Sequence, residues 1–193
     1  AEYLSAQYRA AGIPAADISV MRYQKTAALI VRWRAEGKPA AKPIMLMAHM
    51  DVVEAKREDW TASDPFVFTE RDGYYYGRGT SDIKQGIAAT TTAILKLKAG
   101  GFRPKRDIIV FYTGDEETEG AGAALGATAW HDLLDVEYVL NADGGGGGFA
   151  PDGRPLGFSL QTAEKTFADY VLTTRNRGGH SSKPRPDNAI YQL

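Results

Sequence analysis

Four acidic side chains follow directly on a continuous apolar run. The run extends from Ile108 to Tyr112, and residues 114–120 then bring Asp115, Glu116, Glu117 and Glu119 between two glycines. The run is typical of a buried strand, and glycine lets the backbone turn sharply at its end. Because neighbouring carboxylates repel one another and lose hydration, this cluster requires cations or hydrogen-bond donors. The alternative is a solvated acidic turn, since most charge clusters lie on the surface.

Other potential ligands occupy comparable positions. His49 and Asp51 follow the apolar run 44–48, Asp82 lies in a loop before a helical segment, and Asp143 follows a further strand pattern. Strands and helices alternate here, which predicts an α/β sheet with helices on both faces. Ligands of such sheets bind beyond the carboxyl ends of the strands, so we expect these side chains to gather at one rim.

The expected elements follow from periodicity and turn residues. In chain order they are a helix over 1–11, strands over 18–24 and 26–34, a buried strand over 44–48, a hairpin over 66–71 and 74–76, a helix over 83–98, a strand over 107–113, a helix over 121–134 and a buried strand over 136–140. From about residue 164 the pattern predicts a strand over 167–174, a loop with His180 and the start of a helix.

Residues 1–162 are therefore expected to form one domain and residues 163–193 to begin a second. The chain opens inside a helical pattern and stops in the opening turns of another, so both ends are expected to be cut from a longer protein.

Composition excludes several classes of protein. The 193 residues are 44% hydrophobic and 24% charged, with a net charge of −1 and both signs interspersed. No basic face indicates nucleic acid or an anionic membrane, and no apolar run approaches the ~20 residues of a membrane span. The chain has no cysteine, which excludes disulfides and thiolate catalysis and is compatible with the cytoplasm, the periplasm or secretion.

One imidazole and several carboxylates form a plausible zinc ligand set, with an open position for water. The candidates are His49, Asp82, Glu116, Glu117 and Asp143. One of the adjacent glutamates suits the metal and the other suits a general base. Asp51 is two residues from His49 and could orient its ring, whereas a packed structural histidine is the alternative. The glycine run 144–148 lacks the lysine of a phosphate loop and indicates a tight backbone near the metal centre.

Four motifs occur in an order and spacing known from one family of enzymes. They are MAHMDVV at 47–53, GRGTSDIKQG at 77–86, TGDEE at 113–117 and NADGG at 141–145. Over nearly its whole length the chain resembles the di-zinc exopeptidases and deacylases typified by glutamate carboxypeptidase, aminoacylase, carnosinase and succinyl-diaminopimelate desuccinylase. The resemblance implies a three-layer α/β catalytic domain with a mixed, mostly parallel sheet, followed by the start of an α+β lid or dimerisation domain.

The resemblance also implies a ligand set of two zinc ions, with cobalt or manganese as alternatives. His49, Asp82 and Asp143 would hold one ion, and Asp82 would bridge to a second ion held by Glu117. The peptide bond between Asp82 and Ile83 is expected to be cis.

Further roles follow from the same resemblance. Glu116 would be the general base and Asp51 would orient the histidine ligand. His180 would stabilise the oxyanion in the active site of a homodimeric partner, with a surface histidine as the alternative. His131 matches no motif and is expected to be structural.

The sequence departs from the family pattern at the second zinc ion. The family supplies another histidine ligand after the lid, and none of the three histidines of this chain occupies that position. The second site is expected to be incomplete and this 193-residue chain to be inactive or nearly so. The whole protein is predicted to be a zinc-dependent exopeptidase, carboxypeptidase or dipeptidase that acts on small peptides. The alternatives are a deacylase of N-acyl amino acids and a non-catalytic metal-binding or dimerisation module.

Overall fold

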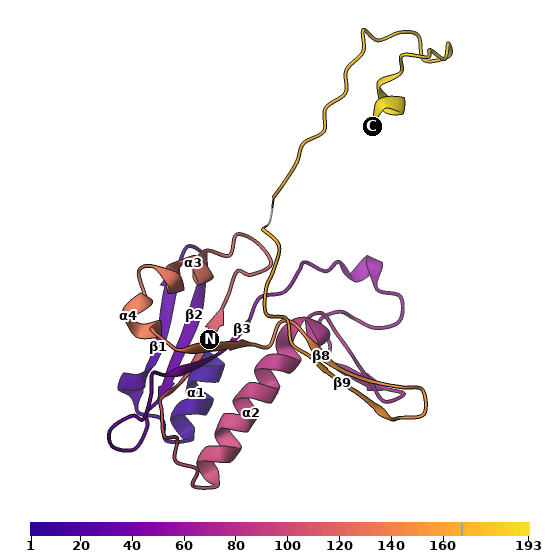
Figure 1. Cartoon of the computed structure of the whole chain (residues 1–193). Helices are drawn as coiled ribbons and strands as arrows, with labels where there is room; N and C mark the ends of the chain where they lie inside the picture. Colours follow the sequence, from indigo (N-terminus) through magenta and orange to yellow (C-terminus); the bar gives the residue numbers. More distant parts are fainter. Residues whose placement is uncertain (167) are drawn as a thin grey trace. The chain divides into compact units, whose positions relative to one another are not determined.

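The computed structural model describes residues 1–166 and 168–193, which divide into two compact units. Unit 1 is Ala1–Leu160 and unit 2 is Gln161–Leu193. Unit 1 contains the central sheet and the helices that pack on it (Figure 1).

The central sheet of unit 1 is mixed. Its five strands lie in the order β1 (Ile18–Tyr23), β2 (Thr26–Trp33), β6 (Ile108–Thr113), β3 (Ile44–His49) and β7 (Tyr138–Asn141). β1 with β2 and β2 with β6 are antiparallel, whereas β3 with β6 and β3 with β7 are parallel. The mixed α/β sheet is confirmed, although its parallel and antiparallel pairings are equal in number in the described chain.

The parallel pairing of β3 with β6 and β7 determines where the ligand-type residues meet. His49 is directly opposite Thr113, the last residue of β6, and the N–H group of Met50 bonds to the carbonyl of Thr113 at 2.8 Å. On the other side Met47 is opposite Asn141, the last residue of β7. Three strands therefore end at the same rim, as expected for the carboxyl edge of an α/β sheet.

Helices cover both faces of the sheet (Figure 1). α1 (Glu2–Ala10) and α2 (Gln85–Ala99) contribute to one buried cluster, which contains Leu29 and Val110 of the sheet. The shorter helices α3 (Ala121–Ala127) and α4 (His131–Leu134) lie over the cluster on the opposite face. Alternate residues of β2 and β6 thus point into two different cores, which is the pattern of a strand buried on both faces.

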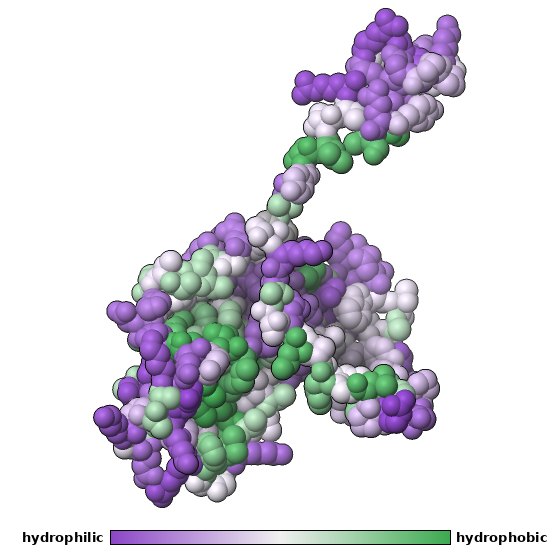
Figure 2. Space-filling view, in the orientation of Figure 1, coloured by the Kyte–Doolittle hydropathy of each residue, from purple (hydrophilic) through white to green (hydrophobic). Residues whose placement is uncertain are grey.

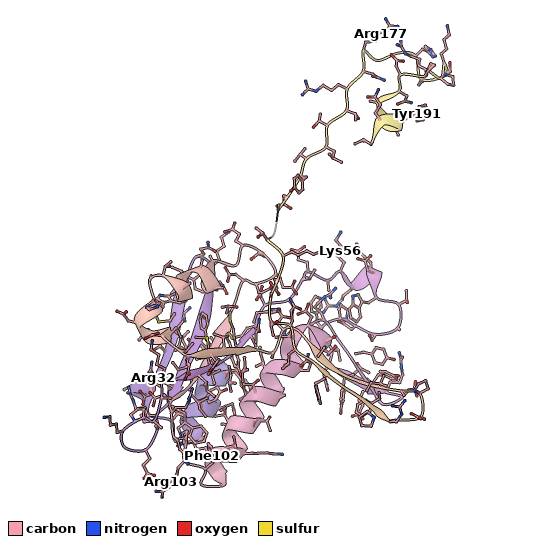
Figure 3. The ribbon with its side chains drawn as sticks, viewed as in Figure 1. Arg32, Lys56, Phe102, Arg103, Arg177 and Tyr191 are labelled. Carbon is pink, nitrogen blue, oxygen red and sulfur yellow. The ribbon has the colours of Figure 1, made fainter. Side chains whose placement is uncertain are left out.

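Ion pairs fix the end of the sheet opposite to the carboxyl rim. Arg32, labelled in Figure 3, donates to the buried carboxylate of Asp107 at 2.9 Å, and the N–H group of Ala35 donates to the same carboxylate at 2.8 Å. Arg103, also labelled there, pairs with Glu36 at 2.7 Å. The start of β6 is therefore anchored independently of its carboxyl end.

The predicted single helix over 121–134 is wrong. α3 ends at Ala127 because Thr128 has non-helical angles, φ −124° and ψ −89°, and α4 begins only at His131. The interruption lets Trp130 pack edge-on against the aromatic rings of Tyr23 and Phe111. Tertiary packing of a large side chain here outweighs the helical pattern.

The prediction that strand 136–140 is buried is also wrong. β7 is the edge strand of the sheet, and the side chains of Val139 and Leu140 are 50% and 57% exposed. Figure 2 shows a hydrophobic area on the viewed face of unit 1 where this strand lies. An apolar run predicts burial only when a further layer covers it, and the described residues provide none over β7.

The remaining elements of unit 1 flank the carboxyl rim. The predicted hairpin is present as β4 (Thr69–Arg71) and β5 (Tyr74–Tyr76), and the segment Thr80–Lys84 kinks before α2 with a cis peptide bond between Asp82 and Ile83, as the resemblance implies. The glycine run forms part of a second hairpin, β8 (Gly146–Phe149) with β9 (Pro155–Ser159). Sequence reasoning missed it because glycine is depleted in strands. Short 3₁₀ turns occupy Ala15–Asp17 and Arg57–Asp59.

Unit 2 has little regular structure. Phe167 of the predicted strand 167–174 lies outside the described residues, and residues 168–174 form no strand, so that prediction is wrong for the part described. A strand requires a hydrogen-bonded neighbour, and none pairs with this segment among the described residues. The predicted helix start is a 3₁₀ turn, Ala189–Gln192, in which the side chain of Asn188 accepts the N–H of Ile190. The interpretation of this unit as the beginning of a lid domain stays a prediction.

Candidate metal centre

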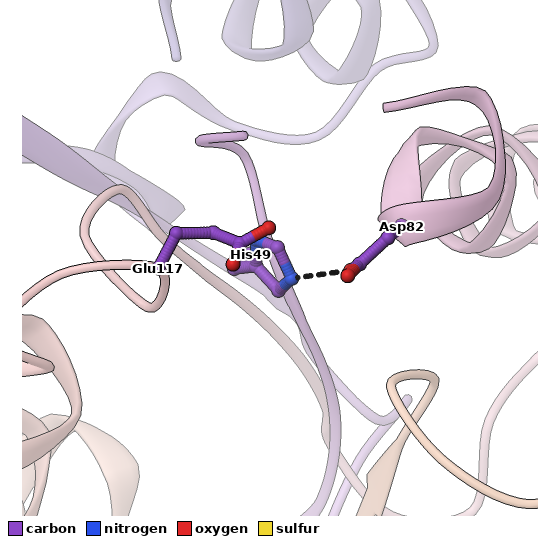
Figure 4. A group of neighbouring side chains, drawn as sticks. All are labelled: His49, Asp82 and Glu117. Atoms are coloured by element: carbon purple, nitrogen blue, oxygen red, sulfur yellow. Dashed lines mark hydrogen bonds and ion pairs between the residues drawn. The ribbon is translucent and has the colours of Figure 1, made fainter. Parts of the chain in front are cut away.

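His49 is at the centre of the carboxyl rim. It ends β3, only 2% of the residue is exposed, and its Nε2 lies 3.0 Å from Oδ1 of Asp82 and 3.5 Å from Oδ2 of Asp143. Figure 4 shows the imidazole between Asp82 and Glu117, which come from different segments of the chain. Carboxylates from two other segments of the chain, Asp82 and Asp143, thus face the buried ring.

Asp51 contacts the other nitrogen of the same ring. Nδ1 of His49 lies 3.1 Å from the carbonyl oxygen and 3.3 Å from Oδ1 of Asp51. A proton held on Nδ1 by these oxygens leaves Nε2 with a free lone pair, which is the usual arrangement of a metal-binding histidine. The same carboxylate accepts the backbone N–H groups of Glu116 at 3.1 Å and Glu117 at 3.0 Å. Asp51 therefore joins the end of β3 to the acidic loop.

Two overlapping groups of ligand atoms surround His49. The first comprises His49, Asp82 and Glu117, and the second comprises His49, Glu116 and Asp143; within each group the atoms lie within 4.8 Å of one another. The resemblance assigns His49, Asp82 and Asp143 to one zinc ion. In the described chain Asp82 belongs to the first group and Asp143 to the second, while His49 belongs to both. Both aspartates nevertheless contact the same imidazole nitrogen.

The charges of the site favour a bound cation. Burial lowers the pKa of His49, but the carboxylates of Asp143, Asp82, Asp51 and Glu116 outweigh burial and raise it. Burial also raises the pKa of Glu116, opposed by His49 and reinforced by the neighbouring carboxylates. One imidazole nitrogen and several carboxylate oxygens within ligand distance fit zinc, whose preferred donors in proteins include both types.

The acidic loop is also held by residues to which the sequence motifs gave no role in the site. Asp115 is 5% exposed and accepts the hydroxyl of Tyr23 at 2.6 Å and the N–H of Gly122 at 3.0 Å. The hydroxyl of Tyr23 in turn accepts the N–H of Gly114 at 3.2 Å. Asp115 thus anchors the loop and belongs to neither ligand group among the described residues. Nothing in the spacing of Tyr23 and Asp115 along the chain could have revealed this contact.

Gly114 is required where the loop leaves β6. A Cβ atom at this position would lie 2.6 Å from the carbonyl oxygen of Ala27, which is closer than real Cβ contacts. The hydroxyl of Thr26 donates to the carbonyl of Gly114 at 2.8 Å. The backbone of the loop is therefore pressed against the β1–β2 hairpin without an intervening side chain.

Replacing Tyr23 by phenylalanine is expected to make the free energy of unfolding fall less steeply as the pH rises in the alkaline range. Burial and the hydrogen bond to Asp115 raise the pKa of Tyr23 from 10.0 to about 12, so the folded state favours the protonated phenol. The stability that this phenol contributes is full below about pH 10 and is lost as the pH rises towards about 12. Urea unfolding at about pH 9 and about pH 11 should show a smaller difference for Tyr23→Phe than for the unmodified chain. Tyr3→Phe, at a side chain 74% exposed, should behave like the unmodified chain, and an unchanged slope for Tyr23→Phe would contradict the assignment.

The other two histidines lie outside both ligand groups. His131 begins α4, its side chain is 62% exposed, and Nδ1 lies 3.8 Å from Asp132. His180 belongs to unit 2, where its Nδ1 lies 2.9 Å from the hydroxyl of Ser182 and accepts the N–H of the same residue at 3.2 Å. The expected role of His180 towards a partner stays a prediction.

The fold is that of solved metallopeptidase domains. The chain superposes on human carnosine dipeptidase 1 with a TM-score of 0.63 at 19% sequence identity, over 77% of this chain and 34% of that chain. At this identity the likeness establishes the architecture alone, and it confirms the α/β fold expected from the sequence.

The chain belongs to peptidase family M20/M25/M40, whose model matches residues 45–165. It is 34% identical over 155 residues to the mouse N-fatty-acyl-amino acid synthase/hydrolase PM20D1, covering 79% of this chain and 31% of that protein. It is 35% identical over 156 residues to a probable succinyl-diaminopimelate desuccinylase of Staphylococcus aureus strain MRSA252, covering 80% of this chain and 35% of that protein. The family resemblance of the four motifs is thereby confirmed. The chain spans about a third of the length of these curated relatives.

Within the described residues, no helix combines the length and the apolar character needed to cross a membrane.

Proposed function

We propose that the whole protein is a zinc-dependent exopeptidase, of the carboxypeptidase or dipeptidase type, that hydrolyses an amide bond beside a free terminus. The observation that carries the proposal is the buried imidazole of His49, whose Nε2 faces Asp82 at 3.0 Å and Asp143 at 3.5 Å. Membership of a peptidase family supports the same reaction class.

In this proposal His49, Asp82 and Asp143 bind one zinc ion, while Asp82 and Glu117 contribute to a second. The proximity of Glu117 to His49 and Asp82 supports the second assignment. When bound, zinc polarises the amide carbonyl and makes the attacking water more acidic. The second ion requires a further ligand, because the only histidine in either ligand group of the described residues is His49. This chain alone is accordingly proposed to be inactive.

Glu116 is the proposed general base. Its Oε2 is 3.9 Å from Nε2 of His49, and Asp51 holds its backbone N–H, so its carboxylate remains beside the ligand set. From this position it can take a proton from the attacking water and give it to the leaving amine. Asp51 positions both His49 and the loop that carries Glu116.

Unit 2 has a proposed role in a homodimer. The resemblance assigns His180 to the stabilisation of the oxyanion in the partner's active site. Its side chain can donate a hydrogen bond through Nε2 while Nδ1 accepts from Ser182, which is the state required for that role.

Hydrolysis of N-acyl amino acids is a second candidate function. The relatives PM20D1 and succinyl-diaminopimelate desuccinylase, at 34% and 35% identity, are named for cleavage of an acyl group from an amino compound or for its formation. The same ligand set serves both reactions, so the difference lies in substrate recognition.

Two measurements test the proposal. Zinc titration of this chain should reveal a metal site, and the whole protein should hydrolyse dipeptides in a reaction that a chelator stops and zinc restores. A parallel panel of N-acetyl amino acids separates peptidase from deacylase. Zinc binding without hydrolysis of either panel would indicate a non-catalytic metal-binding module, and absence of zinc binding would contradict the proposal as a whole.

A further inference from the structure

The turn that joins β1 to β2 binds two of the four acidic side chains of the acidic loop, residues 114–120. The hydroxyl of Tyr23 donates to Oδ1 of Asp115 at 2.6 Å, and Nε2 of Gln24 donates to Oε2 of Glu119 at 3.3 Å. Neither of these carboxylates belongs to a ligand group among the described residues. The turn therefore binds the first and the last acid of the loop, both of which lie outside the candidate metal centre.

The two acids between them, Glu116 and Glu117, lie at the metal centre instead. Each belongs to a ligand group with His49, and Asp51 accepts their backbone N–H groups at 3.1 and 3.0 Å. Neighbouring carboxylates of one short loop are thus divided between two different sets of contacts. Because these side chains are chemically alike, contacts outside the metal centre must contribute to determining which of them face it.

Of the two contacts with the turn, the one between Tyr23 and Asp115 is the stronger. Asp115 is buried, and its carboxylate also accepts the N–H group of Gly122 at 3.0 Å. A short hydrogen bond from a hydroxyl to a carboxylate is charge-assisted and stronger than a bond between neutral groups. Gln24 and Glu119 are exposed, so water competes for their hydrogen bond. The hydroxyl of Tyr23 is therefore the main contact between the turn and an acid of the loop.

The ring of Tyr23 is itself held by packing. Trp130 meets it edge-on, with ring centroids 5.6 Å apart, and also meets the ring of Phe111 in β6 at 6.4 Å. Gly122 leaves room for the hydroxyl, because a Cβ atom at that position would collide with it. Aromatic packing on one side and a glycine on the other thus hold the hydroxyl where it meets Asp115.

We propose that Tyr23 is a positioning residue of the metal centre, because it binds Asp115 away from the metal and so leaves Glu116 and Glu117 to face it. Released from this bond, Asp115 would compete with the two glutamates for the same cation, since it is their neighbour and carries the same group. The inference rests on the proposed function, in which Glu116 is the general base and Glu117 a metal ligand. It assigns the β1–β2 turn a part in the reaction beyond its place in the sheet.

Zinc binding to this chain tests the inference without catalysis. Tyr23→Phe keeps the ring and removes the hydroxyl, and calorimetric titration should show zinc binding weakened by about tenfold, the lower end of the cost of losing a residue that orients metal ligands. Tyr8→Phe is the matched control, because the phenol of Tyr8 is buried and donates to Thr91 at 3.1 Å within the cluster on the opposite face of the sheet. The control should lower the free energy of unfolding and leave the zinc affinity unchanged.

Double variants show whether the hydroxyl acts through the acidic loop. In a Glu117→Gln background Tyr23→Phe should cost little further zinc affinity, whereas in an Asp143→Asn background it should still cost about tenfold, because Asp143 comes from the segment after β7. The visible spectrum of the cobalt-loaded Tyr23→Phe chain should also change, which a loss of stability alone would not produce. Equal losses of affinity in the two backgrounds would overturn the inference.

A second variant displaces the hydroxyl without removing it. Gly122→Ala places a methyl group against the hydroxyl of Tyr23, and should weaken zinc binding in the same direction as Tyr23→Phe. Urea unfolding of the metal-free variants shows whether each retains the fold. Wild-type zinc affinity in both folded variants would overturn the inference.

The whole protein, with zinc in excess, distinguishes this inference from the proposed function. If both hold, Tyr23→Phe should lower kcat for dipeptide hydrolysis by about tenfold and leave KM unchanged, because Glu116 acts on the attacking water and not in substrate binding. Hydrolysis with the same kcat with and without the hydroxyl would overturn the inference alone. Coupling of Tyr23 to Glu117 in zinc binding, without any hydrolysis by the whole protein, would refute the proposed function and leave Tyr23 as a positioning residue of a metal-binding module.

Discussion

Replacement of His49 by alanine is expected to lower the affinity of this chain for zinc by more than about a hundredfold. Loss of a residue that only orients a metal ligand costs about 10–100-fold, and His49 is itself the sole imidazole of both ligand groups in the described chain. The substitution also removes the imidazole nitrogen that Asp82 and Asp143 both face. Calorimetric titration with zinc measures the affinity, and the absorption spectrum of the cobalt-loaded chain reports whether a nitrogen ligand remains.

His131→Ala is the matched control for that experiment. His131 is exposed and begins α4, outside both ligand groups, so its loss should not change the affinity or the cobalt spectrum. Circular dichroism of the metal-free variants tests whether His49→Ala retains the fold. Unchanged zinc affinity in a folded His49→Ala variant would remove the basis of the proposed function.

The second large effect is expected from Asp51→Ala, at about 10–100-fold in zinc affinity. Asp51 binds no metal in this assignment, but its carboxylate fixes Nδ1 of His49 and accepts two backbone N–H groups of the acidic loop. Its removal frees the imidazole to rotate and leaves the N–H groups of Glu116 and Glu117 without their acceptor. The metal-free chain should also lose about 1–3 kcal/mol of stability, because the N–H group of Glu117 is partly buried and would lose its acceptor.

Two further variants make the Asp51 result specific. Asp51→Asn keeps one oxygen acceptor and should restore part of the stability, while the zinc affinity stays low because a neutral amide supports the imidazole less strongly. Asp132→Ala removes a carboxylate that is fully exposed and should change neither quantity. If Asp51→Ala altered stability without altering zinc affinity, Asp51 would serve the fold alone.

The sequence predicted those parts of the structure that follow from local pattern. The strand ending at His49 and the strand before Gly114 were recognisable because each is a continuous apolar run followed by polar residues. Their meeting at one rim followed from the general rule for parallel strands. Chain pattern and chain topology were therefore sufficient to bring His49, Asp82 and the acidic loop together as candidates.

Features that depend on contacts between distant segments could not be predicted in this way. Tyr23 and Asp115 are 92 positions apart, and only the fold brings the phenol to the carboxylate. The break between α3 and α4 depends on the packing of Trp130 against the sheet. The exposure of β7 reflects which residues cover an edge, a property that an apolar run does not encode.

The register of β3 against β6 has a consequence for how such a protein can diversify. Because His49 is held opposite Thr113 in the ladder of β3 with β6, the backbone sets the spacing between the imidazole and the point where the acidic loop begins. The loop after Asp51 and the β4–β5 hairpin belong to no part of that ladder. Loops of this kind tolerate sequence change better than the strands they connect. Sequence change in this loop and hairpin would thus leave the register that places His49 beside the acidic loop unaltered.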